Sequence, residues 1–474
     1  MADILLTHCN HLYYDRKQVR KMQPYPPLQT LVAAAILRQE GFGVALFDAT
    51  FSPPEEGFRA SLLAHKPRLV AICEDNFNFL AKMRLQRNRE LAVFMAAVAG
   101  EQHIPVLISS SDASDRPADY LAQGLDFVIM GEVEETLLQA ARCILNGRSG
   151  GVPEVPGLAY RHPVTRKLRY NPPGEPLRDL SMLPLAAWDL IEVPRYREAW
   201  MKAHGLFSLN LVSSRGCPYQ CNWCAKPIYG QTYRFYPPQR VAEEMHHLKT
   251  AFAPDHIWFA DDIFSLSDLW TEQFSEAVVR LQAGVPFKMQ SRCDLMIPGT
   301  VAALKRAGCA EVWMGAESGS QRILDAMDKG IQVGDVRQAR ENLRLQGIRA
   351  CYFLQFGYPG ETWEDIQSTI RMVRETAPDD IGVSVSYPLP GTRFYSRVAA
   401  EMGAKQNWLD SDDLSMMFRG TYGSEFYAAL HDALHLEVDL RNGSASDSDL
   451  KRLHDLWLRI EELAETGTDV VSSG

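Results

Sequence analysis

Three cysteines within eight residues form the densest group of chemically reactive side chains in this sequence. Cys217, Cys221 and Cys224 lie in the segment SSRGCPYQCNWCAKP, with three and then two residues between them. Three thiolates on one short loop can ligate three irons of a 4Fe-4S cluster, which leaves the fourth iron free to bind a small molecule. A zinc site is the competing interpretation, but zinc prefers four ligands, often two CxxC pairs, and this segment holds one such pair. The spacing therefore favours a redox-active iron–sulfur cluster.

The remaining cysteines, the apolar segments and the net charge indicate the cellular compartment and the class of partner. The other six cysteines are single residues in apolar surroundings, which is typical of buried small side chains rather than of a disulfide framework. The N-terminus lacks a basic region followed by a long apolar stretch, and no apolar run is long enough to span a bilayer. We therefore expect a cytoplasmic protein without stable membrane insertion. The net charge of −10 and the lack of a dense Lys/Arg run argue against nucleic acid and favour a small-molecule substrate.

The elements that must position this chemistry begin with an alternation of short apolar runs and amphipathic stretches over residues 1–145. Strand candidates are residues 2–8, 43–49, 68–74, 105–111 and 127–132, and residues 26–41 have a helical pattern. The alternation predicts an α/β domain with a doubly wound, Rossmann-like parallel sheet, which binds ligands at the carboxyl ends of its strands. No GxGxxG loop follows the first strand, which argues against a dinucleotide, although another nucleotide remains an alternative.

The alternation stops and then resumes. Residues 146–200 are rich in Gly, Pro and charge and predict a linker with one hairpin. Residues 201–400 contain six further strand candidates, which are residues 207–214, 256–261, 287–292, 311–317, 350–357 and 380–387. Six strand–helix units predict a partial (β/α)6 barrel, with active groups at the C-terminal ends of the strands. Residues 401–474 predict a small helical C-terminal region, in which residues 449–465 are strongly amphipathic.

The cysteine segment resembles the signature of the radical S-adenosylmethionine (SAM) superfamily, CxxxCxxC with an aromatic residue, here Trp223, before the last cysteine. The resemblance extends over roughly residues 200–400. It implies that the methionine part of SAM chelates the open iron. It also implies that one electron cleaves SAM to a 5′-deoxyadenosyl radical. The electron would come from a donor such as flavodoxin or ferredoxin.

Polar residues and glycines at the ends of the second to fifth predicted barrel strands carry the same resemblance. It implies that Asp261 and Asp262 contact the methionine ammonium of SAM and that Arg292 contacts the methionine carboxylate. Glu317 and Ser318 would contact the ribose or the carboxylate. Gly357 and Gly360 would let the backbone approach the adenine closely. Helix N-caps and ordinary turns are the structural alternatives for these residues. Their shared position at strand ends favours the functional interpretation for the group as a whole.

The domain that precedes the barrel resembles a cobalamin-binding domain, as in the cobalamin-dependent branch of the superfamily. Residues 25–49 resemble that branch's opening segment, and VIMGEVEETL, with Gly131, Glu132 and Glu134, resembles its closing segment. The cobalt-ligating motif Asp-x-His-x-x-Gly is absent, so we expect no protein nitrogen on cobalt, with His11 as an outlying candidate. The resemblance implies that residues 74–79 line the cobalamin face, where Asn76 and Asn78 would bond the corrin amides or a cobalt-bound water.

Together these features predict a cobalamin-dependent radical SAM enzyme that methylates an unactivated carbon of a small molecule. The alternative on the same scaffold is an oxidative cyclisation, rearrangement or hydroxylation without methyl transfer, as in the anaerobic porphyrin cyclases. A transfer-RNA methylthiotransferase would need a second set of three cluster cysteines and a basic tail, and this chain has neither. A cobalamin sensor or carrier would leave the three cysteines unexplained.

Overall fold

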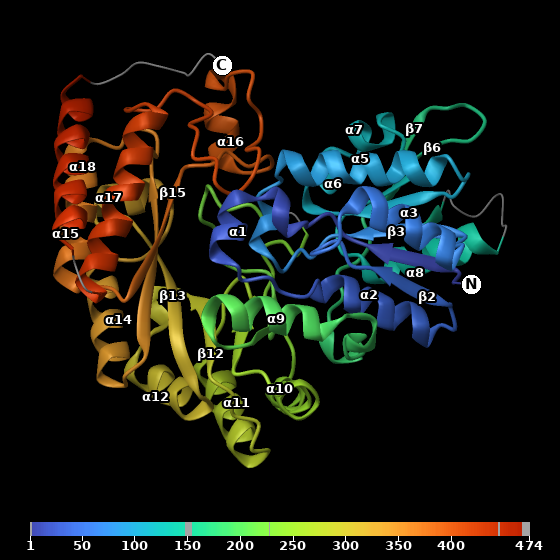
Figure 1. The fold of residues 1–474 in the computed structure, drawn as a ribbon, viewed down its shortest axis with the longest axis horizontal. Coiled ribbons are helices and arrows are strands. Elements are labelled where there is room, and N and C mark those ends of the chain that lie inside the picture. Colours follow the sequence, from blue (N-terminus) through green and yellow to red (C-terminus); the bar gives the residue numbers. More distant parts are fainter. Residues whose placement is uncertain (1, 147–153, 227, 444–445, 467–474) are drawn as a thin grey trace.

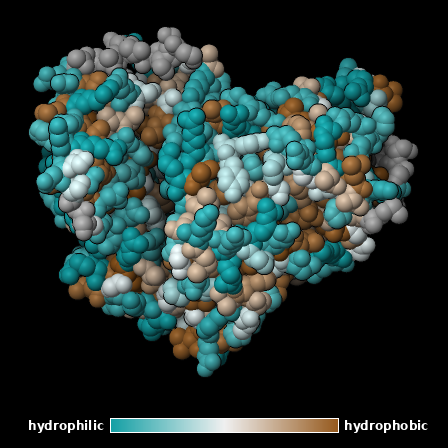
Figure 2. All heavy atoms as spheres, in the orientation of Figure 1, coloured by the Kyte–Doolittle hydropathy of each residue, from teal (hydrophilic) through white to brown (hydrophobic). Residues whose placement is uncertain are grey.

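Two parallel β-sheets, one in each half of the chain, organise the molecule (Figure 1). The computed structural model describes residues 2–146, 154–226, 228–443 and 446–466. Both sheets have fully buried strands flanked by helices, so the predicted α/β class is confirmed. On the face drawn in Figure 2, hydrophilic residues predominate and hydrophobic ones are scattered. Among the described helices, none is both long and apolar enough to cross a membrane.

The N-terminal sheet is doubly wound, as the alternation predicts. Its parallel strands stand in the order β2-β1-β3-β4-β5. They are β1 (Ile4–Thr7), β2 (Val44–Phe47), β3 (Leu69–Cys73), β4 (Val106–Ser109) and β5 (Phe127–Ile129). One face packs on α3 (Pro54–His65), α5 (Gln86–Gly100) and α7 (Pro117–Ala122), and the other on α2 (Leu28–Gln39) and α8 (Glu134–Leu145). Helices on both faces leave the carboxyl ends of the strands as the accessible edge for a ligand.

The linker takes a larger part in the fold than its composition indicates. The predicted hairpin is present as β6 (Leu158–Arg161) and β7 (Leu168–Tyr170). It adds to the N-terminal sheet, because β6 pairs antiparallel with β5. An edge strand left unpaired would expose hydrogen-bonding groups, and the hairpin covers them. The helix α9 (Val193–His204), which the sequence analysis did not predict, then leads into the second half of the chain.

The second sheet is a partial barrel of six parallel strands in chain order. They are β8 (Ser208–Leu211), β11 (His256–Phe259), β12 (Phe287–Ser291), β13 (Cys309–Glu317), β14 (Arg349–Phe356) and β15 (Asp380–Val385). The helices along it are α10 (Pro238–Phe252), α11 (Asp268–Arg280), α12 (Pro298–Ala307), α13 (Gln321–Ala326), α14 (Val333–Leu345) and α15 (Trp363–Thr376). The predicted (β/α)6 architecture is confirmed, and it leaves an open seam between β8 and β15.

Segments from both ends of the chain lie at this seam. Tyr25 places its hydroxyl 3.2 Å from Ser208 Oγ on β8, and its ring centroid lies 4.7 Å from that of Trp258. Figure 1 shows α1 (Arg16–Lys21) at the junction of the two halves. On this helix, Gln18 donates to Ser411 Oγ over 2.9 Å. The seam is therefore closed by the N-terminal segment and by a C-terminal one.

The C-terminal region follows α16 (Arg393–Val398). Its helices are α17 (Ser424–Asn442), which packs on β15, and α18 (Asp447–Thr466), which packs on α17. Residues 402–423 between α16 and α17 contain no helix or strand. This irregular segment reaches the N-terminal half, where Trp408 accepts a hydrogen bond from Gln86 N over 3.0 Å and Asn407 donates to Arg84 O over 2.8 Å.

Candidate functional site

The three cysteines lie on one loop that follows the first barrel strand. This cysteine loop, residues 216–226, begins after β9 (Ser214–Arg215), which pairs antiparallel with β10 (Arg234–Phe235). Gly216 has φ +76°, and a Cβ at this position would lie 2.1 Å from the carbonyl oxygen of Thr232. Only glycine fits so close to another backbone segment, so the start of the loop is fixed by sterics.

The loop offers three sulfur donors that are partly exposed. Burial raises the pKa of the Cys224 thiol to about 12, and the neighbouring Cys221 and Cys217 add to the effect, so the three thiols lie near one another. Across the described residues, no group of three or more His, Cys, Asp or Glu is arranged tightly enough to hold a metal ion. That result includes the three cysteines, so the preference for a cluster with one open iron over zinc rests on their number and spacing along the loop.

Asn222 anchors the tip of the cysteine loop to the barrel, and the sequence analysis did not identify it. Its side chain donates to Ala326 O over 2.8 Å and accepts from the Tyr358 hydroxyl over 2.9 Å. Its backbone N–H donates to Met327 O. The adjacent Trp223, predicted from the family signature, packs against the barrel core, and its indole N–H has no partner there.

Asp261 and Asp262 lie at the carboxyl end of β11, as predicted, but they make different contacts. Asp261 is fully buried and accepts from Ser213 N and Oγ and from Ser214 Oγ, which ties β11 to the start of the cysteine loop. Burial raises its pKa to about 6. Asp262 pairs with Lys82 of α4 (Phe79–Lys82) in the N-terminal half. Their contact with a methionine ammonium stays a prediction.

Arg292 supports the other side of the cysteine loop. Its guanidinium lies 3.7 Å above the ring of Tyr219, a residue of that loop. It also binds Asp294 through two hydrogen bonds of 2.9 and 3.0 Å and donates to Lys329 O over 2.8 Å. The methionine carboxylate of SAM would therefore have to share Arg292 with Asp294, and the predicted contact stays a prediction.

Glu317 and Ser318 are buried in polar contacts within the barrel. Glu317 pairs with Lys329 over 2.7 Å, and both side chains are less than 10% exposed. A Cβ on Gly315 would lie 2.5 Å from an atom of each partner, so a larger residue at that position would displace the pair. Ser318 Oγ lies 3.1 Å from Thr369 Oγ1. Both residues predicted to contact SAM lie at the end of β13 and already have a partner within the protein.

Gly357 and Gly360 form the turn that follows β14. Both have positive φ, of +72° and +83°. The N–H of Gly357 donates to Glu361 Oε2 over 2.6 Å, and burial raises the pKa of this carboxyl to about 8. A Cβ on Gly357 would lie 3.0 Å from Met416 Sδ, whereas Gly360 has open space. A close approach of an adenine to Gly360 is compatible with this geometry.

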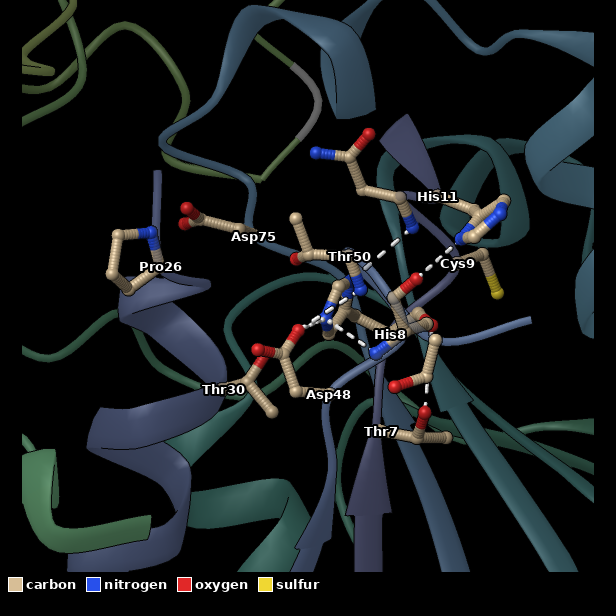
Figure 3. A network of polar contacts seen from close by, with 12 residues as sticks. Thr7, His8, Cys9, His11, Pro26, Thr30, Asp48, Thr50 and Asp75 are labelled. Carbon is tan, nitrogen blue, oxygen red and sulfur yellow. Dashed lines mark hydrogen bonds and ion pairs between the residues drawn. The ribbon is translucent and has the colours of Figure 1, made fainter. Parts of the chain in front are cut away.

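Facing the barrel, the carboxyl ends of β1 and β2 carry a network of polar contacts (Figure 3). His8 Nε2 lies 3.0 Å from Asp48 Oδ1, and the hydroxyl of Tyr196 on α9 donates to Asp48 Oδ2 over 2.9 Å. In Figure 3 the ring of His11 points away from this pair, and its Nδ1 contacts Ala49 O over 2.7 Å. Both ring nitrogens of His8 are engaged with the protein, whereas His11 uses only Nδ1. The expectation of no protein nitrogen on cobalt, with His11 as the outlying candidate, stays a prediction.

The end of β3 shows where the predicted asparagines lie. Asn76 is buried, donates to Gln29 Oε1 over 3.0 Å and accepts from Ser111 N and Oγ, so its amide is already used. Asn78 caps α4 by accepting from Leu80 N. The predicted corrin contacts of both residues stay untested. Two polar atoms at the same edge, Glu74 Oε2 and Ser109 Oγ, are buried without a partner. Because buried polar atoms are rarely left unpaired, these atoms fit an edge that receives the polar groups of a ligand.

The segment predicted to close the cobalamin domain binds the strand that leads to Cys217. Arg215 is fully buried and contacts Glu132 over 3.2 Å and Glu134 over 2.6 Å. Arg234, paired with Arg215 in the β9–β10 ladder, also binds Glu132, over 2.7 Å. Gly131, with φ +99°, makes the turn that starts this segment. The sequence analysis did not single out Arg215, although its position two residues before the first cysteine was a possible signal.

A cavity of about 340 Å³ lies between the two halves. Its lining includes Asn10, Asn78 and Phe79 from the N-terminal half, and Trp258 and Gln290 from the barrel. Gln290 also accepts a backbone hydrogen bond from Phe264 over 2.9 Å, at the mouth of the barrel. The volume is within the range of small-molecule pockets. The ligand-sized space therefore lies between the edge of the doubly wound sheet and the barrel strands β11 and β12.

Comparison with known proteins agrees with this arrangement. Residues 211–373 match the model of the radical SAM superfamily. The chain is 28% identical over 286 residues to an uncharacterised methyltransferase of Pyrococcus horikoshii, a match that covers 60% of each chain, so it spans less than two thirds of that relative. It is 23% identical over 396 residues to the anaerobic magnesium-protoporphyrin IX monomethyl ester cyclase of Rubrivivax gelatinosus, covering 81% of this chain and 68% of the cyclase.

Solved structures share both halves of the fold. The radical SAM methyltransferase TsrM of Kitasatospora setae, with cobalamin and a 4Fe-4S cluster bound, superposes with a TM-score of 0.69 at 19% identity, covering 84% of this chain and 75% of TsrM. The cobalamin-dependent radical SAM enzyme OxsB, with aqua-cobalamin and SAM bound, gives a TM-score of 0.73 at 15% identity, covering 98% of this chain and 72% of OxsB. Residues 211–373 are therefore similar to the radical SAM superfamily, and the chain shares the fold of the cobalamin-dependent enzymes TsrM and OxsB.

Proposed function

We propose that this protein is a cobalamin-dependent radical SAM methyltransferase that acts on an unactivated carbon of a small molecule. The observation that carries the proposal is the position of the cysteine loop. The loop faces the carboxyl edge of the N-terminal sheet, and Arg215 joins the two through Glu132 and Glu134. A cluster on this loop would therefore lie near a cobalamin on that edge.

The fold likeness to TsrM and OxsB supports these cofactors, because cobalamin is bound in both structures, the cluster in one and SAM in the other. When bound, the cluster and SAM supply a 5′-deoxyadenosyl radical, and cobalamin supplies a transferable methyl group. Cys217, Cys221 and Cys224 would hold the cluster, with the electron coming from a donor such as flavodoxin or ferredoxin. The protein's own contribution is position and exclusion of water.

The residues of this chain can provide that positioning. Asp261 and Asn222 fix the two ends of the cysteine loop to the barrel. Arg215 and the Lys82–Asp262 pair fix the loop side of the barrel to the N-terminal half. Because each of these contacts is at least partly buried, the spacing between the two edges is set before a substrate enters. A fixed spacing lowers the entropic cost of bringing reacting groups together.

A radical cyclase or another rearrangement without methyl transfer is the second candidate. The specific observation in its favour is the share of this chain that each relative matches. The cyclase of Rubrivivax gelatinosus matches 81% of this chain, whereas the methyltransferase of Pyrococcus horikoshii matches 60%. Both reactions would use the same cysteine loop, so the geometry of that loop does not separate them.

Labelled SAM separates the two candidates. The anaerobically reconstituted enzyme would be incubated with an extract of its host and with SAM that carries a ¹³C-labelled methyl group, and products would be followed by mass spectrometry. A new product that contains the label and depends on Cys217 supports methyl transfer. A cysteine-dependent product without label would reject methyl transfer and support the cyclase class.

A further inference from the structure

The cavity between the two halves has an unusual charge. Three lysines line it, namely Lys17 and Lys21 from α1 and Lys288 from β12. No Asp or Glu is among the described residues of the lining, although the whole chain carries a net charge of −10. Chance placement of surface charges in an acidic protein would favour the opposite sign. The cavity is therefore a local cationic site.

The backbone directs all three ammonium groups toward one space. Lys17 and Lys21 are four residues apart on a helix, so they share a face. Lys288 and Gln290 alternate along β12, so they share the face of the sheet that lines the barrel interior. Lys288 Nζ also lies 5.8 Å from the ring centroid of Tyr25, on the segment that closes the seam.

None of the three lysines has a carboxylate within 4.0 Å among the described residues. Nearby acids are engaged elsewhere. Asp412 binds Arg20 through both oxygens, and Asp15 accepts from Gln18 N and from Ser411. Unpaired cations beside a cavity are favourable only if water or an anionic ligand solvates them.

The charges around Lys21 also favour an anion in the cavity. Burial, more than any other cause, lowers its pKa to about 8, and the charges of Lys17 and Lys288 add to this effect. Asp380 and Asp15 act in the opposite direction without cancelling it. By surface area the Lys21 side chain is exposed, so this desolvation is partial and the ammonium group is accessible to a ligand in the cavity. An anion in the cavity would relieve this repulsion.

The rest of the lining is mainly apolar, with aromatic and aliphatic side chains, and it includes several amides and hydroxyls. The aromatic side chains are Tyr25, Phe79, Trp258, Trp313, Phe353 and Trp408. The rings of Trp313 and Phe353 lie 4.9 Å apart between centroids and form one wall. Such walls bind flat or apolar bodies, and a few convergent polar groups then fix their orientation.

We infer that this cavity binds a substrate with an apolar, ring-containing body and a carboxylate, which Lys17, Lys21 and Lys288 hold. The inference rests on the proposed function, because it assigns the substrate class of that same site. The reacting carbon would lie at the end of the cavity near Gln290 and Asn78, which face the barrel mouth and the N-terminal sheet. The carboxylate would lie at the opposite, lysine-lined end.

Matched pairs of ligands test the inference directly. One- and two-ring aromatic carboxylic acids and their primary amides would be mixed with the reconstituted holoenzyme, and retained compounds measured by affinity-selection mass spectrometry. We expect acids to bind at least about tenfold more tightly than their amides. A charge-assisted contact of about 1.5–3 kcal/mol corresponds to at least this factor. Equal retention of acids and amides, preference for amides, or retention of neither series would overturn the inference.

Two variants locate the preference. Lys21→Gln and Lys288→Gln should each lower acid binding about tenfold and leave amide binding unchanged, whereas Lys202→Gln, at an exposed position on α9, should change neither. Acid preference that survives both variants would also overturn the inference. Formation of 5′-deoxyadenosine by the wild-type enzyme, measured in parallel, tests the proposed function separately. If the wild type forms no 5′-deoxyadenosine but still prefers acids, the proposed function is rejected. If the wild type forms 5′-deoxyadenosine but shows no preference for acids, only the substrate class is rejected.

Discussion

Arg215 is the residue that most directly joins the chemistry of the barrel to the N-terminal half. Its side chain is fully buried, it pairs with Glu132 and Glu134, and it lies two residues before Cys217. Two carboxylates of the N-terminal half would remain buried without it. Loss of one member of a buried ion group leaves uncompensated charge, which costs far more than the loss of an exposed pair.

We therefore expect Arg215→Met to lower the free energy of unfolding by about 3–5 kcal/mol, measured by denaturant titration of the apoprotein. Arg178→Met is the matched control, because the Arg178 side chain is 91% exposed and should change stability by less than about 0.5 kcal/mol. Adding Glu132→Gln and Glu134→Gln to Arg215→Met should recover part of the loss. Equal stability of Arg215→Met and the wild type would contradict the assigned contact.

Glu361, which holds the Gly357 turn, gives a prediction about pH. Burial raises its pKa in the folded protein to about 8, from an ordinary value of 4.5. A raised carboxyl pKa stabilises the fold at low pH, and this stabilisation is lost as the pH rises through 8. Between pH 6 and 9 the wild type should lose about 2–3 kcal/mol relative to Glu361→Gln. The exposed control Glu401→Gln should follow the wild type, and a pH-independent difference for Glu361→Gln would contradict the prediction.

At the scale of the element, the short β9–β10 pair sets the start of the cysteine loop. Gly216 follows β9 with a positive φ and lies against the backbone of Thr232. Gly216→Ala should displace the loop and reduce the iron bound after anaerobic reconstitution by at least half, because strain and overlap act at the same residue. Gly299→Ala on α12, where a Cβ meets no atom within 4 Å, should bind iron as the wild type does. Full iron content in Gly216→Ala would show that this steric fit is dispensable.

Most elements could be predicted from the sequence, because buried parallel strands and amphipathic helices have distinct periodicities. The alternation located all eleven parallel strands of the two sheets, and the Gly- and Pro-rich composition of the linker predicted its hairpin. It did not place the hairpin on the edge of the N-terminal sheet, because strand pairing depends on partners distant in sequence. The irregular segment 402–423 has no periodicity that would reveal its contacts with the N-terminal half.

The candidate site likewise has features that could be predicted from the sequence and features that could not. The spacing of the three cysteines is local, so the sequence alone located the loop. The partners of Asp261, Arg292 and Asn76 are set by the convergence of strand ends in space, so their engagement with the protein was not foreseeable. The cationic cavity is a further example, because Lys17 and Lys288 are far apart in the chain and meet only after folding.

At the scale of the whole molecule, the contacts between the halves predict a single cooperative unit. Asp15 in the N-terminal segment binds Ser411, which is 396 residues away, and Trp408 accepts from Gln86 N. Unfolding of the apoprotein should therefore give coincident transitions by circular dichroism and by tryptophan fluorescence. Two separated transitions would show that the halves unfold independently and that the seam contributes little to stability.

We propose that a cluster on the cysteine loop cleaves SAM at the junction of the two halves. Formation of 5′-deoxyadenosine from SAM under reducing, anaerobic conditions tests it most directly. The reconstituted wild type should form this product. Cys217→Ala, Cys221→Ala and Cys224→Ala should each reduce its formation to background, while Cys143→Ala on α8 should retain wild-type formation. Product formation that persists in the three cysteine variants, or its absence from a wild type with a full cluster, would contradict the account.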